Sequence, residues 1–377
     1  MDDFRCVEGR ENRMINNKLT AIDLFCGCGG FSYGFKQAGF DILLGIDVWK
    51  DAIVTYKHNI QEAKTINDDI SQISGKDILD TLNVNATDID VIIGGPPCQG
   101  FSVSGKRLRD DPRNLLYKSF VEIVGEIQPK IFVMENVPGL VRLFNGKVKE
   151  EVIGDFSEIG YEVVEKILTA ADYGVPQIRK RVFFVGINKD KISNTSQYEF
   201  PIPEYGKDLK PYITCKEALS DLDFVPVDKS LGDNIEYQIE PQSEYQKLMR
   251  INSKKLLNHS ITIHTEKTRN TIALVPDGGN YKDLPEELQQ TRKVNIAWTR
   301  MSSLKPCFTI DTGHNHHFHY KENRVPTVRE SARIQSFPDD FEFIGIKTSQ
   351  LKQVGNAVPP LMAKAIAENV KEIIRKG

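Results

Sequence analysis

Cys98 stands where the sequence can present a reactive thiol. It follows a strand-like run at residues 90–93 (DVII) and lies within the glycine- and proline-rich stretch 94–102 (GGPPCQGFS). A thiol attacks as the thiolate, and a fixed, partly exposed position near positive charge favours that form. Taken alone, Cys98 fits an ordinary buried cysteine of a tight turn better, so its assignment as a nucleophile depends on motifs elsewhere in the chain.

A glycine-rich turn is the second candidate site. In residues 20–32 (TAIDLFCGCGGFS) an apolar run enters a turn whose glycines would let backbone approach a ligand closely. The GxGxxG spacing of pyrophosphate-binding turns is missing, and about twenty residues further on the acid Asp47 ends the next apolar run. This pattern favours a nucleoside without a pyrophosphate, although such turns also occur for packing alone.

Together these segments resemble the cytosine-5 DNA methyltransferase family of the bacterial restriction-modification type. The resemblance continues in order through residues 135–137 (ENV), 177–181 (QIRKR), 324–338 (RVPTVRESARIQSFP) and 355–358 (GNAV). It spans roughly residues 20–186 and 324–374, and the segment between them reads as the variable target-recognition region of that family.

The resemblance implies methylation of a cytosine in a short site on double-stranded DNA. Carbon 5 of cytosine is a poor nucleophile, so Cys98 would first add to carbon 6 while Glu135 acts at ring nitrogen 3. Arg181 would bind the cytosine carbonyl and Arg179, two residues away on the same face of an extended segment, would organise the loop; for either arginine a phosphate contact is nearly as good an interpretation. The base must leave the duplex, and we expect the loop at 102–113 to act as a mobile lid.

S-adenosylmethionine is the methyl donor that the resemblance implies. Phe25 would stack on adenine, Asp47 would hold the ribose and Asp69 would accept from the adenine amino group. The sequence departs from the family pattern where an aromatic residue usually follows the ribose-binding acid, because Val48 stands there and Trp49 comes one residue later. The other residues assigned to this pocket are Gly27, Gly29, Gly30, Pro97, Asn356 and Val358.

An alternation of strand and helix patterns must position these side chains. Apolar runs at 21–25, 42–46, 91–93, 131–134 and 182–187 alternate with helical patterns such as 115–126 and 148–156. This rhythm predicts an α/β fold with a mostly parallel, Rossmann-like sheet and helices on both faces. Because ligands bind at the carboxyl ends of such strands, we expect the glycine-rich turn, Asp47, Cys98 and Glu135 to share one edge.

Regular order lapses in the middle of the chain and then returns. We expect a first part of the catalytic domain at 1–187, a smaller and irregular target-recognition domain at 188–323, and a return to the catalytic domain at 324–377. Thr327 with Glu330 predicts a capping box that opens a helix. The prolines at 359–360 predict the start of a closing helix at 361–374.

Composition indicates a globular protein. The chain has 377 residues, of which 40% are hydrophobic and 27% charged, without an apolar run long enough to cross a membrane. The first ten residues are too polar for a signal peptide, and six scattered cysteines point to a reducing compartment, so we expect a cytoplasmic protein. The resemblance implies a monomer. The net charge of −3 argues against a wholly basic surface. Basic residues at 106–113, 179–181 and 292–300, against acids at 217–244, predict one basic cleft and one acidic outer face.

Two patterns suggest metal binding. Cys26 and Cys28 have no partner pair at a suitable spacing, so packing is the better interpretation. The run 314–319 (HNHHFH) contains four histidines, but such side chains in a recognition region also contact bases or phosphates. We therefore assign no metal.

Two other functions compete with DNA methylation. A tRNA cytosine-5 methyltransferase of the DNA-methyltransferase-like group would share the same motifs, and the tripeptide at 307–309 (CFT) is similar to a signature of that group. A DNA-binding regulator with a decayed site is the non-enzymatic alternative, but Cys98, Glu135 and Arg181 are all present. The sequence reveals neither the recognition sequence nor whether a separate restriction endonuclease is a partner.

Overall fold

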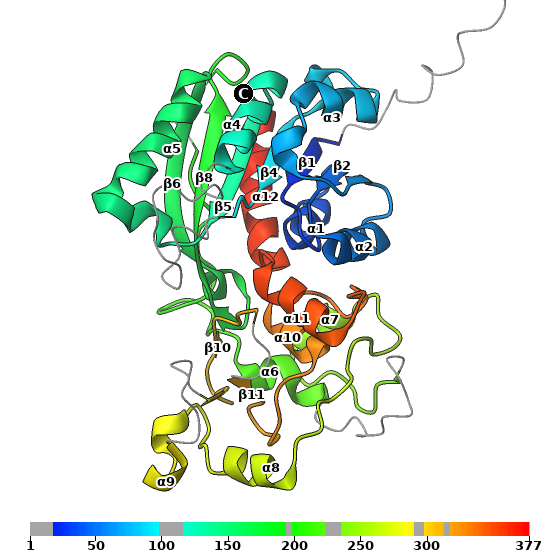
Figure 1. Ribbon diagram of the computed structural model, residues 1–377, viewed down its shortest axis with the longest axis vertical. Coiled ribbons are helices and arrows are strands. Elements are labelled where there is room, and N and C mark those ends of the chain that lie inside the picture. Colours follow the sequence, from blue (N-terminus) through cyan, green and yellow to red (C-terminus); the bar gives the residue numbers. More distant parts are fainter. Residues whose placement is uncertain are drawn as a thin grey trace, which may run out of the picture.

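A seven-stranded sheet forms one half of the protein (Figure 1). The computed structural model describes residues 18–97, 116–193, 198–222, 235–289, 298–312 and 317–376. The strand order is β3-β2-β1-β4-β5-β8-β6, in which β8 runs antiparallel to both β5 and β6 and the other neighbours are parallel. The predicted α/β fold with a mostly parallel sheet is therefore confirmed. The strands are β1 Thr20–Leu24, β2 Asp41–Ile46, β3 Lys64–Ile66, β4 Val91–Gly94, β5 Ile131–Asn136, β6 Tyr161–Thr169 and β8 Lys180–Asn188.

Helices cover both faces of the sheet. One face packs against α1, α2 and α12, and the other against α3, α4 and α5. Successive strand residues point to opposite faces, so in β1 Ala21 joins the first core cluster and Ile22 the second. Burial on both faces explains why these strands read as continuous apolar runs. The helices are α1 Gly30–Gln37, α2 Lys50–Asn59, α3 Gly75–Leu82, α4 Leu116–Ile127, α5 Lys147–Glu158 and α12 Pro360–Lys376.

The closing helix α12 confirms the expectation for residues 361–374. It packs closely on α1, because a Cβ atom on Gly34 would lie 2.4 Å from the Cβ of Ala363. A larger residue than glycine at position 34 would push the two helices apart. The last helix therefore returns to the first strand-helix unit of the chain, as Figure 1 shows.

The other half of the protein contains short elements with little regular order (Figure 1). The predicted capping box of Thr327 and Glu330 is confirmed at the start of α10. Helices here are α6 Cys215–Leu219, α7 Glu244–Arg250, α8 Glu266–Ala273, α9 Glu286–Gln289, α10 Val328–Ile334 and α11 Lys347–Asn356. The short strands are β7 Gln177–Ile178, β9 Thr299–Arg300, β10 Cys307–Phe308 and β11 His317–Phe318. The 3-10 turns within the described residues are η1 Ile70–Gln72, η2 Ala86–Asp88, η5 Leu140–Gly146, η6 Ala170–Tyr173, η8 Ser220–Leu222 and η10 Tyr281–Asp283.

Contacts cross both of the predicted domain boundaries. Ile192 and Tyr198, which follow the boundary at 187, are buried in the same core cluster as the sheet and α12. On the other side, Arg333 of α10 is fully buried and ion-paired with both Asp221 and Asp339. Tyr237 donates to Asp339 at 2.6 Å. The segment after 324 is thus fastened to Asp221 and Tyr237 of the irregular region at 188–323 as well as to the sheet half.

In the part of the chain that the structure describes, no helix combines the length and the apolar composition that crossing a bilayer requires.

A carboxyl group lies in the core beneath α1. Asp23 of β1 is 1% exposed, and its Oδ2 accepts from the Ser32 hydroxyl at 2.6 Å. Among the described residues, its Oδ1 has no hydrogen-bond partner. Burial raises the pKa of Asp23 to about 8, and the hydrogen bonds from Ser32 only partly oppose the rise. The folded protein therefore holds a proton here that the unfolded chain releases above about pH 4.

We expect Asp23→Asn to raise the free energy of unfolding by more at pH 8 than at pH 5. The raised pKa means that the native carboxyl costs stability progressively as the pH rises from about 4 to 8, and asparagine removes that cost. The difference between the two pH values should be about 2–4 kcal/mol in urea-unfolding experiments. Asp80→Asn, at an exposed position on α3, is the control. Equal effects of Asp23→Asn at both pH values would mean that Asp23 is ionised in the native protein.

Candidate functional site

The carboxyl ends of β1 and β2 form the first part of the site. The Cys26 N–H donates to the carbonyl of Ile46 at 2.9 Å, which places the glycine-rich turn against the end of β2. Asp47 then accepts from the Gly27 N–H at 2.8 Å and from the Trp49 N–H at 2.7 Å. Burial raises the pKa of Asp47, and these two hydrogen bonds partly oppose the rise. The carboxylate is thus fixed by backbone on both sides and keeps lone pairs for a further donor.

Different structural requirements explain the individual glycines of this turn. Gly27 has a φ of +52°, and a Cβ atom there would meet no heavy atom within 4 Å, so its backbone faces open space beside Asp47. A Cβ atom on Gly29 would lie 3.0 Å from side-chain atoms of Tyr56 and Ile60, and one on Gly30 would lie 2.4 Å from the carbonyl oxygen of Val358. Only Gly27 offers the open backbone that the cofactor assignment requires, whereas packing accounts for Gly29 and Gly30.

Other residues assigned to the cofactor lie around the same strand ends. Phe25 has a positive φ of 63° and is half-buried, while Val48 is 70% exposed. The Trp49 ring lies under the ammonium group of Lys352 on α11, 4.5 Å from the ring centroid. Asp69 is exposed and accepts at 3.0 Å from the N–H of Ser71.

Two residues of the last motif differ in accessibility. Asn356, at the end of α11, is exposed, whereas Val358 is 7% exposed and packs with the core beside α1. Its carbonyl oxygen lies against Gly30. Val358 therefore supports the turn from behind, and Asn356 is the one of the pair whose side chain can reach a ligand.

A buried ion pair forms the second part of the site, where β5 and β8 lie side by side. Nε of Arg181 lies 2.7 Å from Oε1 of Glu135, and the two side chains are only 15% and 12% exposed. Burial raises the pKa of Glu135, and the positive charges of Arg181 and Arg179 oppose the rise. Asn136 next to it donates to the carbonyl of Pro96 at 3.0 Å and accepts from the Val137 N–H, so it fixes turn geometry.

Backbone leading toward Cys98 lies beside Glu135. A Cβ atom on Gly95 would lie 3.3 Å from Oε2 of Glu135, which leaves little room for a side chain there. Pro97 is half-buried and is the last described residue of this stretch. Cys98 and the expected lid at 102–113 lie outside the described residues, as do Lys106, Arg107, Arg109 and Arg113. Their assignments remain predictions.

Arg179 lies between β7 and β8, where its N–H donates to the carbonyl of Gln177. Its charge, like that of Arg181, opposes the rise in the pKa of Glu135. The side chain is 1% exposed and donates to the carbonyls of Ile310 and Gly355. A phosphate contact by Arg179 is therefore wrong for this structure. Gln177 and Gln335, which share this buried network, lie within quoted motifs but were not singled out from the sequence.

Arg300 also corrects an expectation, because it is not part of a basic cleft. It is 5% exposed, and its guanidinium donates to the carbonyls of Val275, Ile272 and His319 and to Oδ1 of Asn323. It therefore organises the recognition region from inside. Arg292 and Lys293 lie outside the described residues.

Arg300→Met should loosen the recognition region and leave the catalytic half intact. Methionine keeps the apolar bulk but leaves several buried carbonyls without donors, which should cost about 3 kcal/mol or more. We expect faster amide hydrogen exchange around β9 and weaker DNA binding, with unchanged affinity for S-adenosylhomocysteine. Lys305→Met, at an exposed position of the same region, is the control. Exchange as slow as in the unmodified protein would contradict the role of Arg300.

Of the described histidines and cysteines in these patterns, His319, Cys26 and Cys28 are buried, whereas His317 is half-buried and contacts the ring of Phe308. His319 is fully buried, its Nδ1 accepts from the N–H groups of Lys321 and Glu322, and burial lowers the pKa of His319 to about 3. His314 and His316 lie outside the described residues. Cys26 and Cys28 are buried free thiols. Among the described residues, no group of three or more His, Cys, Asp or Glu side chains is arranged to hold a metal ion.

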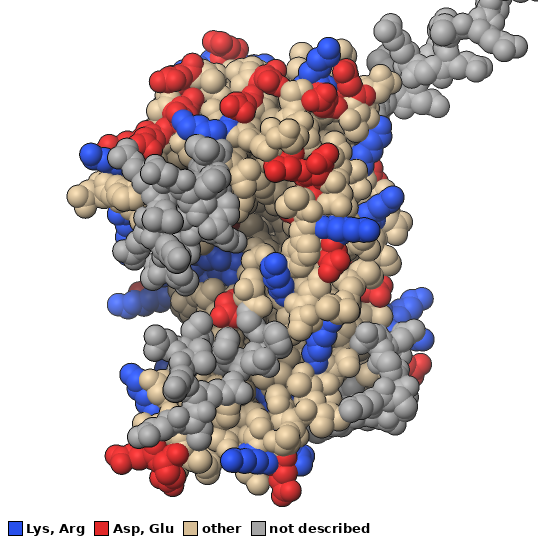
Figure 2. All heavy atoms as spheres, viewed as in Figure 1, with Lys and Arg blue, Asp and Glu red and all other residues tan. Residues whose placement is uncertain are grey.

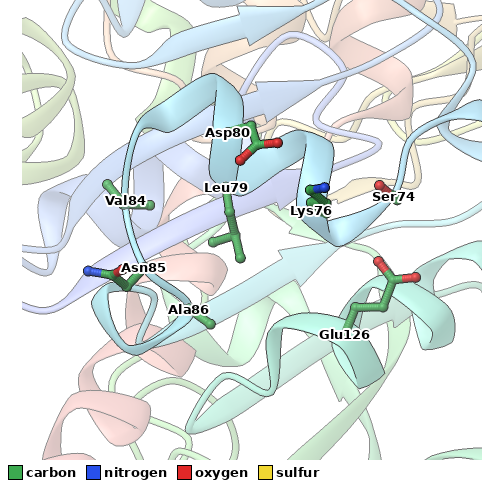
Figure 3. A pocket seen from close by; sticks show the side chains of 8 residues that line it. All are labelled: Ser74, Lys76, Leu79, Asp80, Val84, Asn85, Ala86 and Glu126. Carbon is green, nitrogen blue, oxygen red and sulfur yellow. The ribbon is translucent and has the colours of Figure 1, made fainter.

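The surface shows two hollows of different character. Figure 2 shows the face between the sheet half and the lower half hollowed near its centre, with lysine and arginine side chains beside the hollow. A separate pocket lies between α3, η2 and α4 (Figure 3), and none of its residues is a predicted site residue. The second pocket is therefore not the site assembled above. It is lined by Ser74, Lys76, Leu79, Asp80, Val84, Asn85, Ala86 and Glu126.

Known proteins resemble this chain over nearly its whole length. The model of the C-5 cytosine-specific DNA methylase family matches residues 19–372. The type II methyltransferase M1.HphI of Haemophilus parahaemolyticus is 40% identical over 355 residues, which cover 93% of this chain and 86% of the relative. M.DdeI of Desulfomicrobium norvegicum is 39% identical over 376 residues, covering 93% and 88%.

Solved structures share the fold. A structure described as a prophage-encoded DNA modification methyltransferase (E. coli) superposes with a TM-score of 0.78 at 28% identity, covering 95% of this chain and all of the other. The Dnmt2 methyltransferase of S. pombe has a TM-score of 0.57 at 16% identity, covering 95% and 99%. At that identity the second likeness concerns the fold alone.

Proposed function

The chain belongs to the C-5 cytosine-specific DNA methylase family, and from this premise we propose that it transfers a methyl group from S-adenosylmethionine to carbon 5 of a flipped-out cytosine in a short duplex DNA sequence. It is a DNA (cytosine-5-)-methyltransferase of the restriction-modification type. The observation that carries the finer proposal is the buried ion pair of Glu135 and Arg181, which lies beside the backbone leading to Cys98.

Glu135 and Arg181 suit the recognition and activation of a cytosine ring. Burial raises the pKa of Glu135, so its acid form, which can donate a proton at ring nitrogen 3 as negative charge develops there, persists to a higher pH than in an exposed carboxyl group. Arg181 holds the carboxyl group in place through its Nε and can offer another donor to the ring carbonyl. A buried pair of this kind also excludes water, which strengthens both interactions.

Cys98 would supply the nucleophile. Its thiolate forms a bond to carbon 6, the ring double-bond electrons move to carbon 5, and ring nitrogen 3 takes a proton from Glu135. Carbon 5 then gains the methyl group and loses its proton to solvent, the double bond to carbon 6 forms again as the thiolate leaves, and ring nitrogen 3 returns its proton to Glu135. Because a stacked base cannot present carbon 6 to a thiolate, the proposal requires the cytosine to leave the duplex, at a cost of a few kcal/mol.

The ends of β1 and β2 fit a nucleoside with an amino-acid tail. Open backbone at Gly27, the fixed carboxylate of Asp47, and Phe25, Asp69 and Asn356 nearby would hold S-adenosylmethionine. When bound, it supplies a methyl group on a sulfonium and departs as S-adenosylhomocysteine. We assign no metal to this reaction.

Asp47→Ala should weaken binding of S-adenosylhomocysteine. The substitution removes an acceptor for a ribose hydroxyl and also the acceptor that holds the Gly27 N–H, so a loss of about 1–3 kcal/mol is expected. Calorimetric titration measures this as a dissociation constant raised roughly 5- to 150-fold. Asp80→Ala should bind as the unmodified protein does. Unchanged affinity in Asp47→Ala would remove Asp47 from the pocket.

Double-stranded DNA is the substrate we propose, with residues 188–323 carrying the sequence specificity of a monomeric cytoplasmic enzyme. A cognate restriction endonuclease, if encoded with it, would act separately. The test is transfer of labelled methyl groups to duplex DNA and to tRNA, followed by sequencing of the methylated positions. Labelling of DNA at one short sequence supports the proposal. Labelling of tRNA alone would make the tRNA enzyme correct, and transfer to neither would contradict both.

A further inference from the structure

Three chain segments meet at a buried cluster of polar side chains behind the ion pair of Glu135 and Arg181. The segments are β7, the stretch 310–312 that follows β10, and the end of α11 with the residues after it. Arg179 joins all three, because its Nη1 donates to the carbonyl of Ile310 at 3.2 Å and its Nη2 to the carbonyl of Gly355 at 2.9 Å. Gln177, Arg179 and Gln335, each at most 1% exposed, are called the polar joint below.

The two glutamines of the polar joint complete these connections. Oε1 of Gln177 accepts from the Ile310 N–H at 2.9 Å, and its Nε2 donates to Oε1 of Gln335. Nε2 of Gln335 donates in turn to the carbonyls of Val354 and Ala357, at 3.1 and 2.7 Å. The recognition region is therefore bonded through side chains to the strand before Arg181 and to the segment that ends at Val358.

Backbone packing at the polar joint leaves little freedom. β10 pairs with β7 in parallel, with Cys307 opposite Gln177. A Cβ atom on Gly355 would lie 2.3 Å from the carbonyl oxygen of Asp311, so the stretch after β10 touches α11 where only glycine fits. A displacement of this stretch would thus move Arg179 and Gly355 together.

If this space only needed to be filled, an apolar side chain would stabilise the protein more than Arg179 does. No carboxylate of the described residues lies within ion-pair distance of it, and its Nε has no hydrogen-bond partner among them. Burial lowers the pKa of Arg179 well below its ordinary value. A buried guanidinium held by carbonyls costs stability relative to an apolar side chain of similar size. Its directional bonds to two distant segments are the gain that offsets this cost.

We propose that Gln177, Arg179 and Gln335 are positioning residues that hold β10 of the recognition region against the chain that carries Arg181, so that the seating of the recognition region on DNA sets the geometry of Arg181 and Glu135. This inference rests on the proposed function. As a consequence, a correct target sequence would strengthen DNA binding and would also align Arg181 and Glu135 with the cytosine. Loosening the polar joint should let the base site act on sequences that the recognition region fits poorly.

The test compares Arg179→Met and Arg179→Lys with Lys189→Met, an exposed lysine directly after β8 and outside the predicted basic cleft. A library of duplexes with randomised sequence is methylated and sequenced for 5-methylcytosine, and kcat and KM are then measured on the preferred duplex and on duplexes with one changed base pair. We expect Arg179→Met to lower kcat on the preferred duplex about tenfold or more and to lower the discrimination between duplexes by a similar factor. Arg179→Lys, which can reach one carbonyl, should restore part of both, and Lys189→Met should change neither.

Each outcome supports or contradicts the proposed positioning role of the polar joint. A lower kcat with unchanged discrimination would overturn the inference, as would a folded Arg179→Met that matches the unmodified enzyme. If Arg179→Met melts below the assay temperature, Gln335→Met is the second variant. It removes the bonds to Gln177, Val354 and Ala357 while keeping both bonds of Arg179, so it should lower kcat and discrimination in the same way but to a smaller extent. An unmodified enzyme that methylates no duplex of the library would contradict the proposed function itself, before any variant is compared.

Discussion

Cys98→Ala is expected to abolish both methylation and covalent trapping by DNA that carries 5-fluorocytosine at the target. The thiolate is the only group in the proposal that can saturate the ring, so kcat should fall by at least about a thousandfold. A base can remove hydrogen from carbon 5 as a proton but cannot remove fluorine in this way. The thiolate is then not expelled, and the unmodified enzyme should remain covalently bound to such DNA. Denaturing electrophoresis shows the adduct, and peptide mass spectrometry locates it.

Cys28→Ala is the control for the nucleophile. Burial raises the pKa of Cys28 to about 12 and raises the pKa values of Cys26 and Cys307 well above their ordinary range, so none of these thiols supplies a thiolate near neutral pH. Cys28→Ala should trap as the unmodified enzyme does. An adduct mapped to Cys26, Cys28 or Cys307 would refute the assignment of Cys98.

Glu135→Gln should lower kcat by roughly a hundredfold to ten-thousandfold, because glutamine keeps the shape of the side chain but cannot transfer a proton to ring nitrogen 3. Burial raises the pKa of Glu135, so the acid form persists to a higher pH than in an exposed carboxyl group. The kcat of the unmodified enzyme should then fall as the pH rises through that raised value. Stopped assays over a pH series should show this fall in the unmodified enzyme and none in Glu135→Gln.

Glu122→Gln, at an exposed position on α4, should leave both the rate and the pH profile unchanged. Retention of full kcat by Glu135→Gln at neutral pH would rule out proton donation by this residue. A lower kcat that keeps the original pH profile would assign the pH dependence to another group.

Strands that are buried on both faces of the sheet could be predicted from the sequence, because they are continuous apolar runs. β6 was missed, since its residues Glu162 to Lys166 are only partly buried at the sheet edge and include charged side chains. The insertion of β8 between β5 and β6 could not be predicted either. Strand order depends on how the whole chain packs, and local patterns do not encode it.

Local spacing was also a poor guide to two arginines. The two-residue spacing of Arg179 and Arg181 did not reveal that Arg179 is 1% exposed and donates to the carbonyls of Ile310 and Gly355. Arg300 was grouped with basic residues of a cleft, although its guanidinium satisfies carbonyls in the interior. Composition cannot separate an arginine that binds phosphate from one that organises a loop-rich region, because both occur where turns and basic residues are common.

The buried ion pairs of Arg333 bear on how specificity could be transplanted between related enzymes. Arg333 lies after residue 324, whereas its partner Asp221 belongs to the recognition region, and both are inaccessible to solvent. A graft of residues 188–323 alone would place the donor's residue at position 221 in contact with Arg333 and Asp339. A buried charge left without a partner there would lower the free energy of unfolding by several kcal/mol. The exchangeable unit is therefore longer than the irregular region itself. It extends through α10 to Asp339, so that donor charges arrive with their own partners.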